Sequence, residues 1–333
     1  MREGLAEGSQ EAIGRSVEER RSFFSERVGR YERGLLVRES IVRLDQERAV
    51  ADSLRAGRPV VIRGVWRAGK TSLGHALRRN FPGPFVHEDV GPYGTELSAE
   101  SFRASLAETV DERPGDERTI VIDEAIALAD RPDLLGVIDD LRAPGVRLAV
   151  VAHWTRNTDQ AMRRAFDGYD AHFVRLLTRD EVRLVALRPF VGTPVTFTDA
   201  AVDRLADLSG GRALEVQLLC SALLDPSKPF WRDDATFDAS DVDRLSGNEI
   251  AMRQLADEGL SHYRKVYDSA FDEEDRALFR SIAENGGAAA GDADPARVRP
   301  LLDIAYLRSE SDGSYRTNGE LFERFVRSRV QNS

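Results

Sequence analysis

Short apolar runs alternate with amphipathic segments through the first half of the chain. Five runs are too brief for buried helices, which favours buried strands; they are PVVIR (59–63), PFVHEDV (84–90), TIVIDEA (119–125), VRLAVVAH (146–153) and AHFVRL (171–176). Helical patterns separate them, such as the stretch 97–110, which Ser98 is placed to cap. Strands alternating with helices predict a parallel sheet with crossover helices.

The strand pattern ends after Arg179. Two amphipathic helices are predicted at 198–211 and 213–224, on either side of the glycine pair 210–211. From about Tyr263 onward, a helix with a glycine stop and a second helix, broken or kinked near Pro300, precede a hairpin-like Asp-Gly turn and a final helix. Helices followed by a short hairpin are typical of a winged-helix module.

The N-terminal 57 residues are predicted as helix and loop. One helical stripe contains Phe24, Val28, Tyr31 and Leu35, and a second helix, about 45–56, precedes Gly57. The stripe either packs on the body of the protein or serves as a partner or self-association helix. The predicted domains are an N-terminal helical extension (1–42), an α/β core (43–178), a helical lid and linker (179–260) and a winged-helix domain (261–333).

Composition narrows the class of protein. The chain has 333 residues, 41% hydrophobic and 31% charged, as expected of a soluble protein with more than one domain. It shows no run of about 18 apolar residues and no secretory signal, so we expect no membrane association and a cytoplasmic location. A net charge of −10 disfavours a general nucleic-acid coat. The single cysteine, Cys220, excludes an internal disulfide.

A phosphate-binding loop follows the first predicted strand. Gly64, four spacers and Gly69-Lys70-Thr71 have the Walker A spacing, between a strand and a helix. The glycines allow main-chain N–H groups to curl around an anion, and the following helix adds its N-terminal dipole. The side chain of Lys70 would reach the β- and γ-phosphates, and the Thr71 hydroxyl would bind Mg²⁺. The predicted nucleotide contacts are Gly64, Val65, Trp66, Arg67, Ala68, Gly69, Lys70, Thr71 and Ser72.

A second motif ends the strand 119–125. Its carboxylates, Asp123 and Glu124, belong at the carboxyl edge of the sheet, where open α/β sheets bind ligands. Asp123 is expected to hold Mg²⁺, and Glu124 to orient and deprotonate the attacking water. A helix cap is the alternative for an isolated Asp-Glu pair.

Polar residues at the end of the strand 146–153 would lie beside this motif. His153 is the first candidate for a sensor of the terminal phosphate and joins Glu124 and Lys70 in the predicted catalytic set; Thr155 is the second. A polar residue that merely ends the strand is the alternative.

Three arginines are candidates for contacts with a nucleotide. Arg212, at the start of the helix 213–224, would either reach across to it or remain solvated on the helix surface. Arg163 and Arg164 are the candidates for an arginine supplied to a neighbouring copy.

These motifs resemble those of STAND-type P-loop ATPases and the archaeal-ATPase relatives within the AAA+ class. That family tends to carry Gly-Pro-Arg-Arg-x-Gly-Lys-Thr-Ser-Leu, and this chain has Gly-Val-Trp-Arg-Ala-Gly-Lys-Thr-Ser-Leu at 64–73. Arg67 therefore matches the second family arginine, and Trp66 replaces the first; we expect Trp66 to stack on the nucleotide or on a neighbouring loop. Residues 122–125, Ile-Asp-Glu-Ala, are similar to the family's Walker B. Residues 208–212 are similar to its lid segment, with Ala213 in place of a proline.

The resemblance spans roughly residues 43–330. It implies a P-loop NTPase core with a helical lid and a C-terminal winged helix. It also implies an ATPase of low basal turnover that binds ATP or ADP with Mg²⁺. ADP would hold such a protein closed, and ATP would open it for self-association or a protein partner, in signalling or in defence. No effector domain or sensor repeat is visible in the sequence, so we expect those parts to be other proteins.

Two other functions stay open. A DNA-binding ATPase, such as an initiator, a helicase loader or a transposition regulator, would use the winged helix. The candidate recognition helix, however, offers only Arg297 and Arg299 against Asp303. A P-loop kinase is disfavoured because no acceptor-substrate motif is present.

Overall fold

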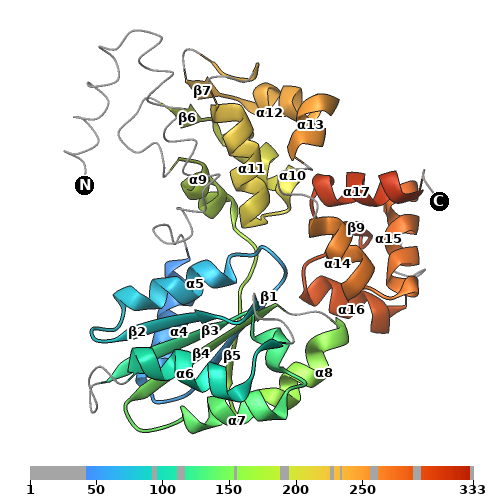
Figure 1. Ribbon diagram of the computed structural model, residues 1–333. Coiled ribbons are helices and arrows are strands. Elements are labelled where there is room, and N and C mark those ends of the chain that lie inside the picture. The colour runs from blue at the N-terminus through green and yellow to red at the C-terminus, as the bar shows by residue number, and fades with distance from the viewer. Residues whose placement is uncertain are drawn as a thin grey trace, which may run out of the picture. The chain divides into compact units, whose positions relative to one another are not determined.

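The structure is a computed structural model that describes residues 43–91, 96–110, 117–153, 156–187, 195–225, 229–232, 235–255, 262–287 and 294–330. The chain forms two compact units, one spanning Val37–Arg175 and one containing Leu176–Ser333 (Figure 1). The stripe from Phe24 to Leu35 lies outside the described residues. Among the described residues, no helix is both long and apolar enough to span a membrane.

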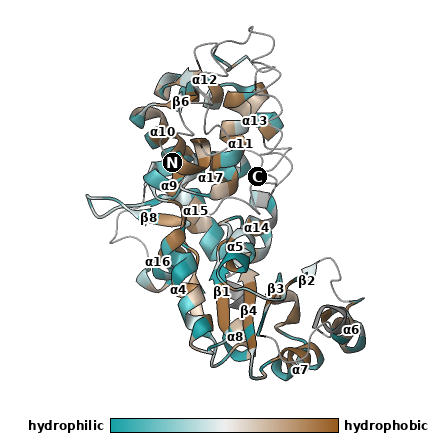
Figure 2. Cartoon of the chain, turned by 90° about the vertical axis from the view of Figure 1, so that its left-hand side faces the viewer, coloured by the Kyte–Doolittle hydropathy of each residue, from teal (hydrophilic) through white to brown (hydrophobic). Residues whose placement is uncertain are grey.

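The first unit contains a five-stranded parallel sheet in the order β2-β3-β4-β1-β5. Its strands are β1 (Val60–Gly64), β2 (Phe85–Asp89), β3 (Arg118–Asp123), β4 (Val146–His153) and β5 (Asp170–Phe173). The central strands are almost entirely buried. Figure 2 shows that β1 and β4 are predominantly hydrophobic. All five strands predicted from short apolar runs are therefore confirmed, because a strand buried on both faces needs no polar alternation.

Helices cover both faces of this sheet (Figure 1). They are α4 (Leu44–Arg55), α5 (Lys70–Ala76) with η1 (Leu77–Arg79), α6 (Ala99–Val110), η3 (Ala125–Leu128), α7 (Pro132–Asp140) and α8 (Arg156–Ala165). One hydrophobic core joins the face of Val61, Ile122 and Val150 to α6, α7 and α8. On the opposite face α5 approaches so closely that a Cβ on Gly74 would lie 3.1 Å from Val121.

The second unit begins with α9 (Arg179–Leu187), α10 (Asp199–Ser209), α11 (Ala213–Leu224), α12 (Ala239–Ser246) and α13 (Glu249–Leu255). The expectation that strands end after Arg179 is wrong, because β6 (Thr196–Phe197) and β7 (Thr236–Phe237) form a parallel pair. Between α10 and α11, Gly210 has φ +59°, and a Cβ there would lie 2.8 Å from the carbonyl oxygen of Asn318. The glycine pair thus lets this turn approach the segment that follows β9.

The chain ends in α14 (His262–Ala270), α15 (Glu273–Asn285), α16 (Pro295–Asp303), β8 (Leu307–Ser309), β9 (Tyr315–Thr317) and α17 (Glu320–Val330). Strands β8 and β9 are antiparallel and turn at Gly313, at the predicted Asp-Gly step. Helix α16 runs through Pro300 without a break. The winged-helix interpretation of this segment stays a prediction.

Candidate nucleotide site

The loop between β1 and α5 is shaped by its two glycines. A Cβ on Gly64 would lie 2.9 Å from the carbonyl oxygen of Val174, so no larger residue fits there. Gly69 is the N-cap of α5 and has φ +97°, which strains any L-residue with a side chain. The loop side chains of Val65 and Ala68 are buried, whereas Arg67 is exposed. The buried side chains of Val65 and Ala68 therefore fix the backbone of the loop on the body of the first unit.

Arg43 binds the phosphate loop through a buried hydrogen bond, and no sequence motif identifies this residue. It precedes α4, is 5% exposed, and its Nη1 donates a hydrogen bond to the carbonyl oxygen of Ala68 at 2.6 Å. Because a hydrogen bond from a charged donor is stronger than a neutral one, Arg43 stabilises the conformation of the loop.

Lys70, the first residue of α5, is buried within the loop. Its ammonium group donates a hydrogen bond to the carbonyl oxygen of Val65 at 3.0 Å. Burial lowers the pKa of Lys70 to about 8, while the carboxylates of Glu124 and Asp123 act in the opposite direction. A phosphate here would favour the charged ammonium in the same way.

Asp123 ends β3 and is buried, with an exposed fraction of 3%. Burial raises the pKa of its carboxyl group, and a hydrogen bond from Thr71 acts to lower it. The main-chain N–H of Glu124 donates to Asp123 Oδ1 at 2.8 Å. A hydroxyl and a carboxylate side by side are oxygen ligands of the kind that Mg²⁺ prefers, so Thr71 and Asp123 fit a magnesium ion.

A stacked pair of histidines adjoins Asp123, and neither is among the site residues predicted from the sequence. Nε2 of His87, on β2, is 3.5 Å from Asp123 Oδ2. The ring of His75, on α5, stacks on His87 with the ring centroids 3.8 Å apart. The stacked His75 ring packs against His87 and so helps to fix the imidazole that contacts the Asp123 carboxylate.

Glu124 adopts φ +56° directly after β3, and its side chain is 41% exposed. Its Oε2 lies 3.4 Å from Nδ1 of His153, an electrostatic contact rather than a well-formed hydrogen bond. His153 lowers the pKa of Glu124, opposed by burial and aided by Lys70. Glu124 is therefore an ionised carboxylate at neutral pH.

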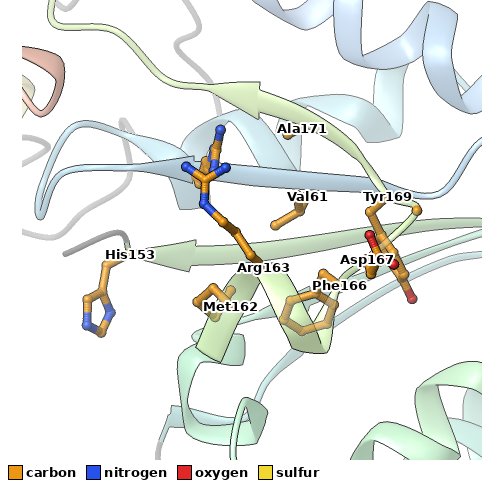
Figure 3. Close-up of a pocket in the computed structure, with 10 residues that line it drawn as sticks. Val61, His153, Met162, Arg163, Phe166, Asp167, Tyr169 and Ala171 are labelled. Carbon is orange, nitrogen blue, oxygen red and sulfur yellow. The ribbon is translucent and has the colours of Figure 1, made fainter. Parts of the chain in front are cut away.

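His153 is the last residue of β4, and its backbone pairs in register with Gly64. Its ring also lines a cavity of about 260 Å³ together with Arg163, Met162 and Phe166 (Figure 3). Arg163 and Arg164 are exposed near the end of α8. Thr155 lies outside the described residues.

Arg212 belongs to the second unit and is completely buried there. Its guanidinium lies over the rings of Tyr306 and Phe322 and donates a hydrogen bond to the carbonyl oxygen of Asn318 at 2.8 Å. Because the Arg212 guanidinium is buried, it is not available to contact a nucleotide. The predicted nucleotide contact of Arg212 is therefore wrong, and so is the alternative that it is solvated on the helix surface.

The carboxyl edge of the sheet thus brings together an ammonium group, a hydroxyl group, two carboxylates and an imidazole. They come from the loop after β1 and from the ends of β3 and β4. This edge is where α/β sheets bind ligands.

Comparisons with known proteins agree with this geometry. No protein-family model matches the chain. A stretch of 119 residues is 37% identical to the tRNA modification GTPase MnmE of Mesorhizobium japonicum; it covers 33% of this chain and 27% of that protein. The chain therefore spans about a quarter of the length of this relative.

Two solved structures have a similar fold. The Walker-type ATPase PABY2304 of Pyrococcus abyssi has a TM-score of 0.56 and 15% identity, over 87% of this chain and 97% of that one. A mutant of RuvB from Thermotoga maritima has a TM-score of 0.50 and 18% identity, over 87% of this chain and 98% of that one. The chain has the fold of a P-loop NTPase, a parallel five-stranded sheet with flanking helices, and this part of the fold prediction is confirmed.

Proposed function

We propose that the chain is an ATP-binding, slowly hydrolysing P-loop ATPase of the STAND/AAA+ type that acts as a nucleotide-dependent regulatory switch. The observation that carries this proposal is the convergence of Lys70, Thr71, Asp123 and Glu124 at one edge of the sheet. A structural role would not require a buried ammonium facing two carboxylates.

Each group has a part in phosphate chemistry. The main-chain amides of the loop and the Lys70 ammonium bind the phosphates and orient the terminal one. Thr71 and Asp123 hold Mg²⁺, which neutralises phosphate charge when bound. The ionised carboxylate of Glu124 accepts the proton of the attacking water.

Hydrolysis by matched variants tests this assignment. Lys70→Ala should lose ATP binding, whereas Glu124→Gln should bind ATP normally and lose turnover by about 10²- to 10⁴-fold, because general-base contributions have this size. Steady-state phosphate release and equilibrium binding give both quantities for the wild type and the two variants. Normal turnover by Glu124→Gln would show that another group activates the water. Parallel assays with GTP test the preference for ATP.

The switch is tested by the mass of the particle in solution. Size-exclusion chromatography with light scattering should give different masses with ADP and with a slowly hydrolysed ATP analogue, if ATP promotes self-association. The variant Lys70→Ala should keep one mass in both conditions. Equal masses for the wild type in the two conditions would refute nucleotide-dependent self-association and would not contradict the proposed ATPase activity.

A further inference from the structure

Trp66 of the phosphate loop lies against His153 at the end of β4. The centroids of the two rings are 4.7 Å apart, and their planes are inclined by 47°. This contact joins the middle of the loop to the strand whose last residue pairs with Gly64. Only 16% of the His153 side chain is exposed, and the Trp66 indole contributes to its burial.

His153 in turn lies against Glu124. Nδ1 of His153 and Oε2 of Glu124 are 3.4 Å apart, and the Glu124 side chain is more exposed than the histidine, at 41% against 16%. An exposed glutamate has several rotamers, and a fixed neighbour reduces their number. The imidazole is such a neighbour on the side of β4.

Gly91, which follows β2, lies close to the aliphatic part of the Glu124 side chain. A Cβ built on Gly91 would lie 3.1 Å from both Cβ and Cγ of Glu124, closer than ordinary packing allows. The stem of the glutamate is thus confined by Gly91, and its carboxylate contacts His153. The side chain is held at two points.

We propose that Trp66 is a positioning residue for hydrolysis: it fixes the ring of His153, and the ring orients the carboxylate of Glu124. The proposal rests on the proposed ATPase function. It assigns to Trp66 a role in turnover and none in nucleotide affinity. Direct stacking of Trp66 on the base is the competing assignment, and it would change the affinity instead.

A double-mutant cycle with Trp66 and His153 separates these assignments. Trp66→Ala should lower kcat by about ten- to a hundredfold, since small displacements of a reacting group have effects of this size. The dissociation constant for ATP should change less than threefold, which corresponds to roughly 0.7 kcal/mol. Trp66→Phe, which keeps an aromatic face, should restore most of the lost rate.

Non-additivity is the decisive result of the cycle. If Trp66 acts only through His153, Trp66→Ala should have no further effect in the His153→Ala background. Rate losses that multiply would overturn the proposal, and so would a loss of ATP affinity with unchanged kcat. Circular dichroism of each variant shows whether it is folded.

A readout without ATP separates this proposal from the ATPase function. In a Trp154→Phe, Trp231→Phe background, Trp66 is the single tryptophan, and an imidazole in contact with an indole quenches its fluorescence. His153→Ala should raise this emission, and His75→Ala, a control on another element, should leave it unchanged. Unchanged emission in His153→Ala overturns the contact. A wild type without turnover refutes the proposed function, whatever the emission.

Discussion

Arg43 shows how a single residue outside the motif determines the shape of the phosphate loop. Its guanidinium donates to the carbonyl oxygen of Ala68, and a Cβ on Gly69 would lie 2.8 Å from its Nη1. The carbonyl oxygen of Ala68 is therefore bound by Arg43 and turned toward it.

We predict that Arg43→Ala weakens ATP binding about tenfold, because a charged hydrogen bond contributes on the order of 1.5–3 kcal/mol to the loop conformation. Arg48→Ala, at an exposed position of α4, the helix that Arg43 precedes, is the matched control. Fluorescence titration with a labelled ATP analogue measures both affinities. Equal affinities for the two variants would contradict a bracing role for Arg43.

The residues of the site differ in how far the sequence reveals them. Lys70, Thr71 and Asp123 are readable because their spacing and the adjacent apolar strands are local features. Arg43 and His87 act on residues 25 and 36 positions away, at Ala68 and Asp123, contacts that only the folded chain creates. Arg212 was misjudged because a sequence does not show that a guanidinium is enclosed by aromatic rings.

At the scale of elements, a buried polar cluster of Arg212, Glu215 and Tyr263 connects the start of α11 to the C-terminal helices. Arg212 and Glu215 are both fully buried, with Nε and Oε1 3.8 Å apart, and Tyr263 of α14 adjoins them. The Arg212 guanidinium also lies over the rings of Tyr306 and Phe322, 4.9 and 5.6 Å from their centroids. The cluster makes α11 and the C-terminal helices parts of one unit.

At about pH 8, above the raised pKa of Glu215, Arg212→Met should destabilise the second unit by about 3–5 kcal/mol, because it leaves an ionised Glu215 buried without its cation. Arg253→Ala, at a side chain that is 77% exposed, should change stability by less than about 0.5 kcal/mol. Urea denaturation followed by circular dichroism measures both effects. A small effect of Arg212→Met would show that the cluster is solvated.

The same cluster predicts a dependence of stability on pH. Burial raises the pKa of Glu215 from 4.5 to about 7, although Arg212 acts to lower it. Between these values the folded protein holds a proton that the unfolded chain has lost, so this group's stabilising contribution falls as pH rises from about 4.5 to 7. Glu215→Gln should remove this fall, of up to about 3 kcal/mol. Parallel pH profiles of urea denaturation for the two proteins would disprove the raised pKa.

Element prediction succeeded where the apolar runs were long and failed where they were short. Val146–His153 was predicted with its observed bounds, because eight mostly apolar residues leave little ambiguity. Strands β6 and β7 have two residues each, too few for any periodicity, and the stacked rings of Phe197 and Phe237, 5.2 Å apart, hold them together through tertiary packing. Pro300 is tolerated within α16 although it suggested a break.

At the scale of the molecule, charge argues against DNA as the partner. Arg297, in the candidate recognition helix, forms ion pairs with the carboxylates of Asp272, Glu274 and Asp275. Its charge is thereby neutralised within the C-terminal helices. The net charge of −10 acts in the same direction.

We therefore predict no tight binding to duplex DNA at about 150 mM salt. A gel-shift or anisotropy titration from low to high salt, with and without ATP, measures this. Binding that is tight and weakens steeply with salt would favour the DNA-binding ATPase instead, and Arg299→Ala, at an exposed position of α16, would then be expected to reduce it.

The most direct test of the account is calorimetric titration of the folded protein with ATP and magnesium. We predict heat of binding at a stoichiometry of one nucleotide per chain, and none for Lys70→Ala with the same circular dichroism spectrum. An absence of heat for the wild type with both ATP and GTP would contradict the central claim that the loop from Gly64 to Thr71 binds a nucleoside triphosphate.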